Sequence, residues 1–232
     1  MRRAGTGFVT GLATGIRRQP GVRRLMRLPA VFSLNDLSLG EGLTPEAARV
    51  TISRWHCAGM AAPAGPRSGL WYNLVVDRRG ADVNLGAVLR RQFGSPVMIG
   101  AAVLHDAGWI TQIPHAATVA VPTARCYPQI TGAALYGRPP VWYAAVATAW
   151  RAARRWHDGL PSLPPEFALA DALGHRDSLH HLRPDDIEIP YGTPYGTLMG
   201  ALRAMHVPPD IFWPYLEASG IRQPPSRQMR GR

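Results

Sequence analysis

The 232-residue sequence predicts an α+β fold with two folded segments. Apolar residues at helical spacing alternate with short extended runs bounded by glycine and proline, which is typical of mixed folds. The hydrophobic fraction of 46% is ordinary for a globular protein of this length. A polar break at Asp77-Arg78-Arg79-Gly80 separates the two segments. We therefore expect a domain boundary near residue 80.

The clearest element of the first segment is a helix that begins after Thr44. Thr44 is a favourable N-cap, Pro45 suits the first helical position, and Gly59 ends the helix. Its apolar stripe comprises Ala48, Ile52 and Trp55. Its polar side comprises Arg49, Ser53, Arg54 and His56. One face of this helix should therefore pack on a core while the other faces outward.

Elements on both sides of this helix complete a recognisable order. Pro20 opens a helix with Val22, Leu25 and Leu28 inside and Arg23, Arg24 and Arg27 outside. Residues 31–37 predict a short strand that enters a helix capped by Ser33 and Asp36. After Gly59, two short strands flank a turn over residues 63–69. Helix, strand, helix, turn, helix and hairpin is the order of a winged helix-turn-helix.

This order predicts a DNA-binding domain over residues 20–79. In such modules the second helix of the turn enters the major groove and the hairpin touches the DNA backbone or minor groove. The predicted DNA-contacting residues are Arg23, Arg24, Arg27, Thr44, Arg49, Ser53, Arg54 and Arg67. The alternative is a plain packing module or a protein-binding domain, because short helix-plus-hairpin units serve those purposes as well.

The formal charge of +11 is concentrated at the two ends of the chain. Residues 1–27 carry seven arginines and residues 219–232 carry four, with no acidic residue in either range. The 15 arginines between them balance all 15 acidic residues. We interpret residues 1–19 as a flexible basic arm and residues 219–232 as a basic tail that neutralise phosphates. A tail that only aids solubility is the alternative.

The second segment, residues 80–218, predicts an α/β domain. Helical patterns cover residues 83–93, 142–156 and 165–173, and two further helices are expected after residue 196. A helix of small residues follows Pro96 and ends at Gly108, and residues 118–122 predict a buried strand. The mixture of buried strand and small-residue helix indicates a core of its own.

The sequence predicts no enzyme, no metal site and no cofactor. Phosphate-binding loops, nucleophile elbows and paired carboxylates in a convincing context are absent from it. The histidines and aspartates considered as metal ligands are Asp171, His175, Asp177, His180 and His181, whose more common role is a solvated helix end. His105 and Asp106 predict a structural hydrogen-bonding pair, and Asp185-Asp186 predicts a loop.

Several stretches resemble the AbiEi family, the antitoxins of type IV toxin–antitoxin systems. In the first segment they are LPAVFSLNDL at 28–37, ISRWHCAGM at 52–60 and GLWYNL at 69–74. In the second they are IGAAVLHDAGWITQIP at 99–114, LPPEFALADAL at 163–173 and LRPDDIEIP at 182–190. The resemblance implies a winged helix followed by a larger α/β domain. It also implies repression of the protein's own operon through promoter inverted repeats, and neutralisation of a nucleotidyltransferase-like toxin without a stable complex.

The predicted function is therefore a DNA-binding antitoxin and autorepressor that acts as a monomer or weak dimer on double-stranded promoter DNA. The alternatives are a stand-alone winged-helix regulator with a ligand- or partner-binding second domain, and a nucleic-acid-acting enzyme. A neighbouring toxin gene would favour the first over the second, and clustered acidic residues in a cleft would favour the third. Two isolated cysteines and the lack of a membrane-length apolar run predict a cytoplasmic protein without a membrane partner.

Overall fold

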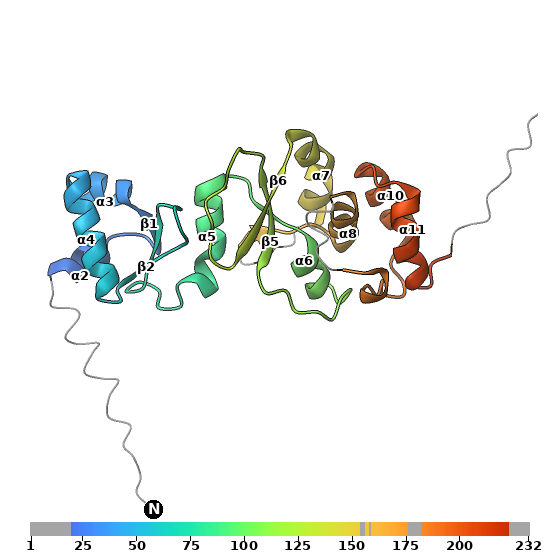
Figure 1. Ribbon diagram of the computed structural model, residues 1–232, viewed down its shortest axis with the longest axis horizontal. Coiled ribbons are helices and arrows are strands. Elements are labelled where there is room, and N and C mark those ends of the chain that lie inside the picture. The colour runs from blue at the N-terminus through green and yellow to red at the C-terminus, as the bar shows by residue number, and fades with distance from the viewer. Residues whose placement is uncertain (1–19, 154–155, 158, 176–181, 223–232) are drawn as a thin grey trace, which may run out of the picture. The chain divides into compact units, whose positions relative to one another are not determined.

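The fold is α+β, as the sequence predicted. The computed structural model describes residues 20–153, 156–157, 159–175 and 182–222 (Figure 1). The chain divides into two compact units. Unit 1 comprises the chain up to Gln92 together with Pro128–Thr131, and unit 2 comprises Phe93–Tyr127 and the chain from Gly132 onward. The predicted arm at residues 1–19 and most of the predicted tail lie outside the described residues.

Within its described residues, unit 1 contains four helices and a small antiparallel sheet. The helices are α2 (Pro20–Leu25), α3 (Leu34–Glu41), α4 (Pro45–Cys57) and α5 (Ala81–Phe93, whose last residue is assigned to unit 2). The strands are β1 (Val31–Ser33), β2 (Ala61–Pro63) and β3 (Leu70–Asn73). They pair in the order β1-β3-β2, with β3 in the centre. Helices α3 and α4 pack against each other, and α4 also contacts β2 (Figure 1).

The ends of α3 and α4 are capped as the sequence predicted. Ser33 and Asp36 form a reciprocal capping box at the start of α3. The Thr44 hydroxyl accepts the Ala47 N–H at 3.3 Å at the start of α4. Gly59 lies in the left-handed region with φ 66°. A side chain is unfavourable in that conformation, so glycine is the residue that permits the chain to leave α4 toward β2.

The core of unit 1 is formed by the predicted apolar stripes. Its buried members are Leu25, Leu28, Phe32, Leu37, Ala48, Ile52, Trp55 and Ala61. Asn73 is also buried at the end of β3, and its amide donates to the Leu25 carbonyl at 2.8 Å and to the Leu28 carbonyl at 3.2 Å. The Leu25 carbonyl also accepts the Leu28 N–H at 3.1 Å, so the Asn73 amide adds a second donor at the end of α2. Asn73 therefore fastens the first helix to the sheet.

Unit 1 extends past the polar break at Asp77–Gly80 because α5 belongs to it. The Arg91 guanidinium of α5 donates to the Val31 carbonyl at 3.1 Å and forms an ion pair with Asp36. Residues 128–131 also return to this unit, and Thr131 N–H donates to the Ala64 carbonyl at 2.9 Å. The predicted segments 20–79 and 80–218 therefore differ from the compact units by one helix and one short return of the chain.

Unit 2 contains a mixed three-stranded sheet. Strand β5 (Ala117–Pro122) pairs antiparallel with β4 (Val97–Met98) and parallel with β6 (Ala133–Arg138). Residues 119–121 of β5 are fully buried, in agreement with the predicted buried strand. Strands β7 (Trp156–His157) and β8 (Leu160–Pro161) form a separate two-stranded pair.

The helices of unit 2 lie along the chain close to the positions expected from the sequence. They are α6 (Gly100–Asp106), α7 (Pro140–Ala153), α8 (Pro165–Gly174), α10 (Tyr195–Ala204) and α11 (Pro209–Ala218), with the short 3-10 helix η1 at Pro184–Asp186. Helix α6 contacts both β5 and α8. The helix predicted to reach Trp156 ends at Ala153, and Trp156 lies in β7 instead. Within the described residues, none of these helices is both long and apolar enough to cross a membrane.

Candidate nucleic-acid interface

The exposed face of α4 holds the most accessible group of predicted DNA-contacting residues. Arg49, Ser53 and Arg54 are exposed, whereas Ala48, Ile52 and Trp55 on the opposite face are at most 3% exposed. Within the part of the chain that the structure describes, Arg49 and Arg54 form no ion pair. Their guanidinium groups are hydrated and available, so a phosphate or base edge can bind them without breaking an internal contact.

The three arginines predicted on the first helix do not have the same environment, and α2 ends at Leu25, before Arg27. Arg24 Nε lies 2.9 Å from a Glu41 carboxylate oxygen, and Arg27 lies 3.8 Å from the other oxygen of the same carboxylate. Arg23 is exposed and forms no ion pair among the described residues. Arg24 and Arg27 thus connect α2 to the end of α3, and Arg23 is the freely accessible cation of this helix.

Thr44 begins the helix-plus-hairpin stretch, and Arg67 lies in its hairpin. Thr44 is exposed, and its hydroxyl accepts the cap bond described above while its own O–H can still donate to a ligand. Arg67 is exposed in the connection between β2 and β3 and has a positive φ of 60°. A residue with a side chain is rare in that conformation, which indicates that the surrounding chain fixes it.

His56, predicted on the polar side of α4, is bound to the hairpin. Its Nδ1 lies 3.1 Å from the Ala61 carbonyl oxygen. Its ring also meets the Trp71 indole edge-on, with ring centroids 5.7 Å apart. His56 therefore fixes the hairpin against the end of α4, and the outward-facing cations of the helix are Arg49 and Arg54.

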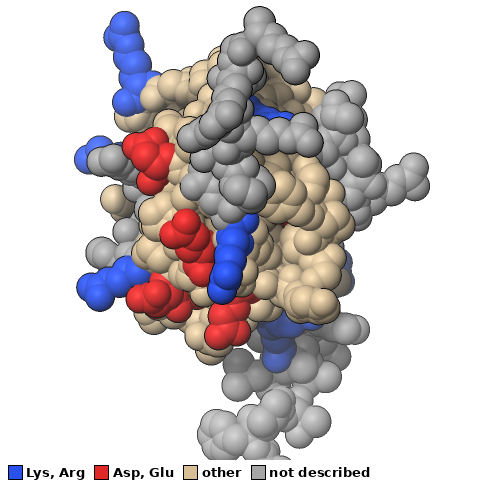
Figure 2. All heavy atoms as spheres, turned by 90° about the vertical axis from the view of Figure 1, so that its right-hand side faces the viewer, with Lys and Arg blue, Asp and Glu red and all other residues tan. Residues whose placement is uncertain are grey.

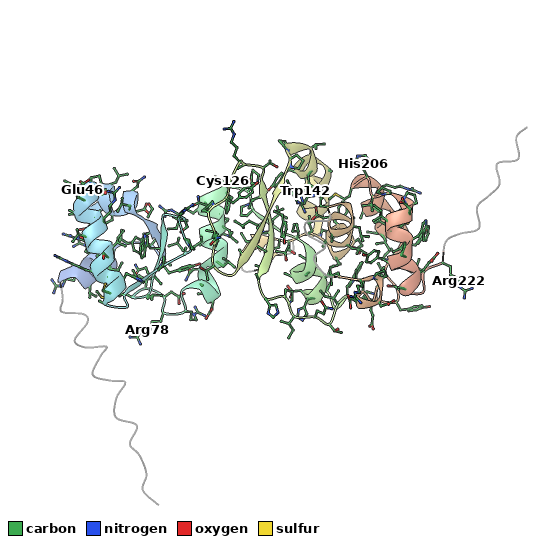
Figure 3. The ribbon with its side chains drawn as sticks, in the orientation of Figure 1. Glu46, Arg78, Cys126, Trp142, His206 and Arg222 are labelled. Atoms are coloured by element: carbon green, nitrogen blue, oxygen red, sulfur yellow. The ribbon has the colours of Figure 1, made fainter. Side chains whose placement is uncertain are left out.

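Acidic and basic side chains are unequally divided between the units. Residues 20–92 hold ten arginines against five acidic residues, a formal charge of +5, whereas residues 93–222 hold nine arginines against ten acidic residues. Figure 2 shows acidic side chains close to arginines on the α10–α11 side of unit 2. In unit 1 the side chains of Glu46 and Arg78 both point away from the body of the unit (Figure 3). Unit 1 is therefore the more attractive of the two to a polyanion.

The ion pair of Asp36 and Arg91 lies beside the start of α3. Burial alone would raise the pKa of the Asp36 carboxyl. The hydrogen bonds from Arg91, from the Ser33 N–H and from the Ser33 hydroxyl outweigh burial and lower that pKa below its ordinary value. Asp36 is therefore ionised at neutral pH and is engaged inside the unit. The Asp36 charge does not face the outer side of α4.

Unit 2 uses its predicted metal-ligand candidate Asp171 for a buried ion pair. Arg138 Nε and Nη2 donate to the two Asp171 carboxylate oxygens at 2.9 and 3.0 Å, and Trp142 Nε1 donates at 2.7 Å. Arg138 and Asp171 are 1% and 0% exposed. Trp142 lies inside unit 2 between α7 and its neighbours (Figure 3). With three donors on its carboxylate, Asp171 has a structural role.

The other residues considered for chemistry do not come together in one group where the structure describes them. His175 Nε2 lies 3.7 Å from Asp171, while Asp177, His180 and His181 lie outside the described residues. Asp186 accepts the Arg183 N–H at 2.7 Å at the start of η1. His105 and Asp106 lie 3.7 Å apart on the surface of α6. Across the described ranges, three or more histidine, cysteine, aspartate or glutamate side chains never meet in a group able to hold a metal ion.

Comparison with known proteins yields no match, either to a protein-family model or to a curated sequence.

Sequence reasoning missed three anchoring residues, all of which act over long distances in the chain. Asn73 reaches α2 from β3, Arg91 reaches β1 and α3 from α5, and Arg138 reaches α8 from β6. Each separation exceeds 30 residues. Residue spacing predicts contacts within one helix or hairpin, and it carries no signal for partners this far apart.

Proposed function

We propose that this protein binds double-stranded DNA through unit 1 and that α4 is its recognition helix. The observation that carries the proposal is the division of α4 into two faces. Ala48, Ile52 and Trp55 are buried, while Arg49 and Arg54 are exposed and unpaired within the described residues. A helix held on a core by one face, with free guanidinium groups on the other, suits insertion into a major groove.

The elements around α4 support a winged helix-turn-helix arrangement. The order of α2, β1, α3, α4, β2 and β3, and the sheet order β1-β3-β2, are those expected of such a module. Helix α3 packs against α4 as the first helix of the turn would. The connection between β2 and β3 would be the wing, and Arg67 is exposed on it.

The side chains on α4 have complementary chemistry for the duplex. Arginine donates two parallel hydrogen bonds to guanine O6 and N7, and serine binds either a base or a phosphate. Arg49 and Ser53 are four residues apart, so they lie on one line of the helix surface. We assign Arg49 and Ser53 to base edges or adjacent phosphates, and Arg23, Arg54 and Arg67 to the flanking backbone.

The test uses a fluorescein-labelled duplex taken from the promoter of the protein's own gene and a scrambled duplex of the same length. The variant R49A/S53A/R54A should lose the preference for the promoter duplex. Replacing Arg203 and Arg222, two exposed arginines of unit 2, removes the same charge and should preserve that preference. A triple variant that keeps the preference of the unchanged protein for the promoter duplex would show that α4 is not the recognition helix.

We further propose that DNA binding serves autorepression in a toxin–antitoxin pair, in a reducing cytoplasm and without a membrane partner. The resemblance to AbiEi antitoxins at 28–37, 52–60, 99–114 and 163–173 supports this part of the proposal. The cognate toxin would be nucleotidyltransferase-like and would form no stable complex. The protein would bind an inverted repeat as a monomer or weak dimer, and no catalytic role is assigned to it.

Co-expression with the neighbouring gene tests the antitoxin role separately from DNA binding. The full-length protein should restore the growth of cells that express the neighbouring gene. The R49A/S53A/R54A variant should also restore growth, because the resemblance assigns antitoxic activity to the second domain. If neither protein restores growth, the proposed antitoxin role is wrong. The proposal is then reduced to a DNA-binding regulator without a toxin partner.

A further inference from the structure

The connection between β2 and β3, Ala64–Gly69, is a compact loop with its own hydrogen bonds; we call it the hairpin loop. The Ser68 hydroxyl donates to the Gly65 carbonyl at 2.9 Å, and the Ala64 N–H donates to the Leu70 carbonyl at 2.9 Å. Ser68 is 8% exposed and Ala64 is fully buried, whereas Arg67 projects from the loop and is exposed. Arg67 is therefore the one charged side chain of the hairpin loop, and it is exposed to solvent.

Arg67 holds a backbone conformation that its own side chain disfavours. Its φ of 60° lies in the left-handed region, which non-glycine residues adopt when the surrounding structure fixes them. The bonds of Ser68 fix the loop from inside. The remaining support comes from a segment more than 55 residues later in the sequence.

That segment is Pro128–Thr131, which we call the return segment because it rejoins unit 1 from the connection between β5 and β6. Thr131 N–H donates to the Ala64 carbonyl at 2.9 Å, and Ile130 is 4% exposed. A Cβ atom at Gly65 would lie 2.0 Å from the Gln129 carbonyl oxygen. Glycine is therefore required at position 65 for the return segment to lie against the hairpin loop.

The same contact shapes the surface next to Arg67. A hollow of about 330 Å³ is lined by the hairpin loop, by Trp71 and by Thr131 of the return segment. Arg67 lines this hollow and forms no ion pair among the described residues. Moving the return segment would remove one wall of the hollow and one of the restraints on the loop that carries Arg67.

We infer that the return segment is a positioning element for DNA binding: it holds the hairpin loop so that the Arg67 guanidinium can bind a DNA phosphate. This inference rests on the proposed function of unit 1. Gly65 and Ile130 are positioning residues, because they act on DNA only through the placement of Arg67. The return segment is also the covalent connection between β5 and β6, so this connection contributes to the DNA affinity of unit 1.

The experiment compares full-length variants on the labelled promoter duplex over a range of salt concentrations. Arg67→Ala should lower the slope of log affinity against log salt by about 0.9, the value for one phosphate contact. Gly65→Ala should lower it by the same amount, since the new methyl group displaces the return segment. The double variant G65A/R67A should bind no more weakly than R67A, because both changes remove one contact.

Two further variants separate placement of Arg67 from general loss of structure. Ile130→Ala loosens the return segment without a clash and should reproduce the lowered slope even where G65A folds poorly. Gly40→Ala adds a methyl group to α3, with no atom within 4 Å of it and no left-handed φ, and should keep the wild-type slope. A lowered slope in G40A equal to that in G65A would overturn the inference, because a methyl group away from the return segment would then suffice.

The outcomes distinguish this inference from the proposed function. If the unchanged protein does not bind the duplex, the proposed function is wrong and the inference is overturned with it. If the unchanged protein binds and both G65A and I130A keep its salt slope, only the inference is overturned. Additive losses in G65A/R67A would also overturn it, since Gly65 would then act independently of Arg67.

Discussion

Arg49 in unit 1 and Arg138 in unit 2 have the same side chain in opposite environments. Arg49 is exposed on α4 and has no ion-pair partner in the described part of the chain. Arg138 is 1% exposed, and two of its nitrogens bind the two carboxylate oxygens of Asp171. The Trp142 indole donates to the same carboxylate.

The difference follows from the cost of removing a guanidinium group from water. A buried charge is tolerated when an opposite charge and hydrogen bonds replace its hydration, so Arg138 is committed to Asp171. An exposed arginine keeps its hydration and can exchange it for a phosphate or a base edge. Positive charge alone therefore does not identify a DNA-binding surface. The partners of each arginine within the protein decide whether it is available to bind DNA.

The largest expected effect comes from breaking the buried pair in unit 2. Asp171→Ala removes the carboxylate that accepts hydrogen bonds from Arg138 Nε, Arg138 Nη2 and Trp142 Nε1. The free energy of unfolding should fall by about 3–5 kcal/mol, the usual result of removing one partner of a buried ion pair. Urea unfolding followed by circular dichroism measures this loss.

A matched double replacement sharpens the same comparison. The variant R138M/D171L removes both charges and fills a similar volume, so it should recover most of the stability lost in D171A. Replacing Asp210, an exposed residue of α11, should change the free energy of unfolding by less than about 0.5 kcal/mol. A loss of similar size for Asp210 and Asp171 would contradict the assignment of a buried structural pair.

Local signals predicted much of the fold. The Thr44 cap, the apolar stripe of α4, the capping box of Ser33 and the left-handed Gly59 are all set by residues within a few positions of one another. The limits of unit 1 were not predictable in this way. Arg91 and Thr131 join that unit through contacts to Val31 and Ala64, which are distant in sequence.

The candidate site was predictable to the extent that helical periodicity determines exposure. The pattern placed Arg49, Ser53 and Arg54 on the outer face of α4, where the structure also has them. The same pattern placed Arg24 on the outer side of α2, because periodicity carries no information on a partner such as Glu41 in the next helix. Trp156 was assigned to the helix of α7 since its spacing fits the stripe, but the helix ends at Ala153.

The next largest effect concerns the free arginine of α4. Arg49→Ala should weaken binding to the promoter duplex by about 1–3 kcal/mol if Arg49 contacts a base. The free energy of unfolding should change by less than about 0.5 kcal/mol, because no internal contact is lost. Fluorescence anisotropy and urea unfolding measure the two quantities. If R49A loses stability but keeps its DNA affinity, Arg49 has a structural role, as Arg138 does, and does not bind DNA.

The ion pair of Asp36 and Arg91 predicts a pH dependence of intermediate size. Since the pKa of Asp36 is lowered in the folded protein, its contribution is complete above the ordinary pKa and is lost as the pH falls through the lowered value. Wild-type protein should therefore lose up to about 1 kcal/mol more stability than Arg91→Ala as the pH falls through and below the ordinary aspartate pKa of 3.8. Thermal unfolding at a series of pH values tests this, and parallel curves for the two proteins would refute it.

The smallest expected effect is found within a single helix. Arg23 and Arg24 are neighbours on α2, yet Arg23 is exposed and unpaired among the described residues, while Arg24 lies 2.9 Å from Glu41. Arg24→Ala should lower the free energy of unfolding by about 0.2–1 kcal/mol, the range of surface ion pairs. Arg23→Ala should leave stability unchanged and lower the salt slope of DNA binding by about 0.9.

The variant R24A/E41A completes this test, because it removes both partners and leaves the net charge of unit 1 unchanged. Glu41 also lies beside Arg27, so this variant releases Arg27 as well. If Arg24 binds Glu41 and not DNA, the salt slope should not fall below that of the unchanged protein. A lowered slope in R24A/E41A, equal to that in R23A, would show that Arg24 leaves its carboxylate partner to bind phosphate. In that case a partly exposed ion pair would not prevent an arginine from binding DNA phosphate. Only a fully buried ion pair, such as that of Arg138, would prevent it.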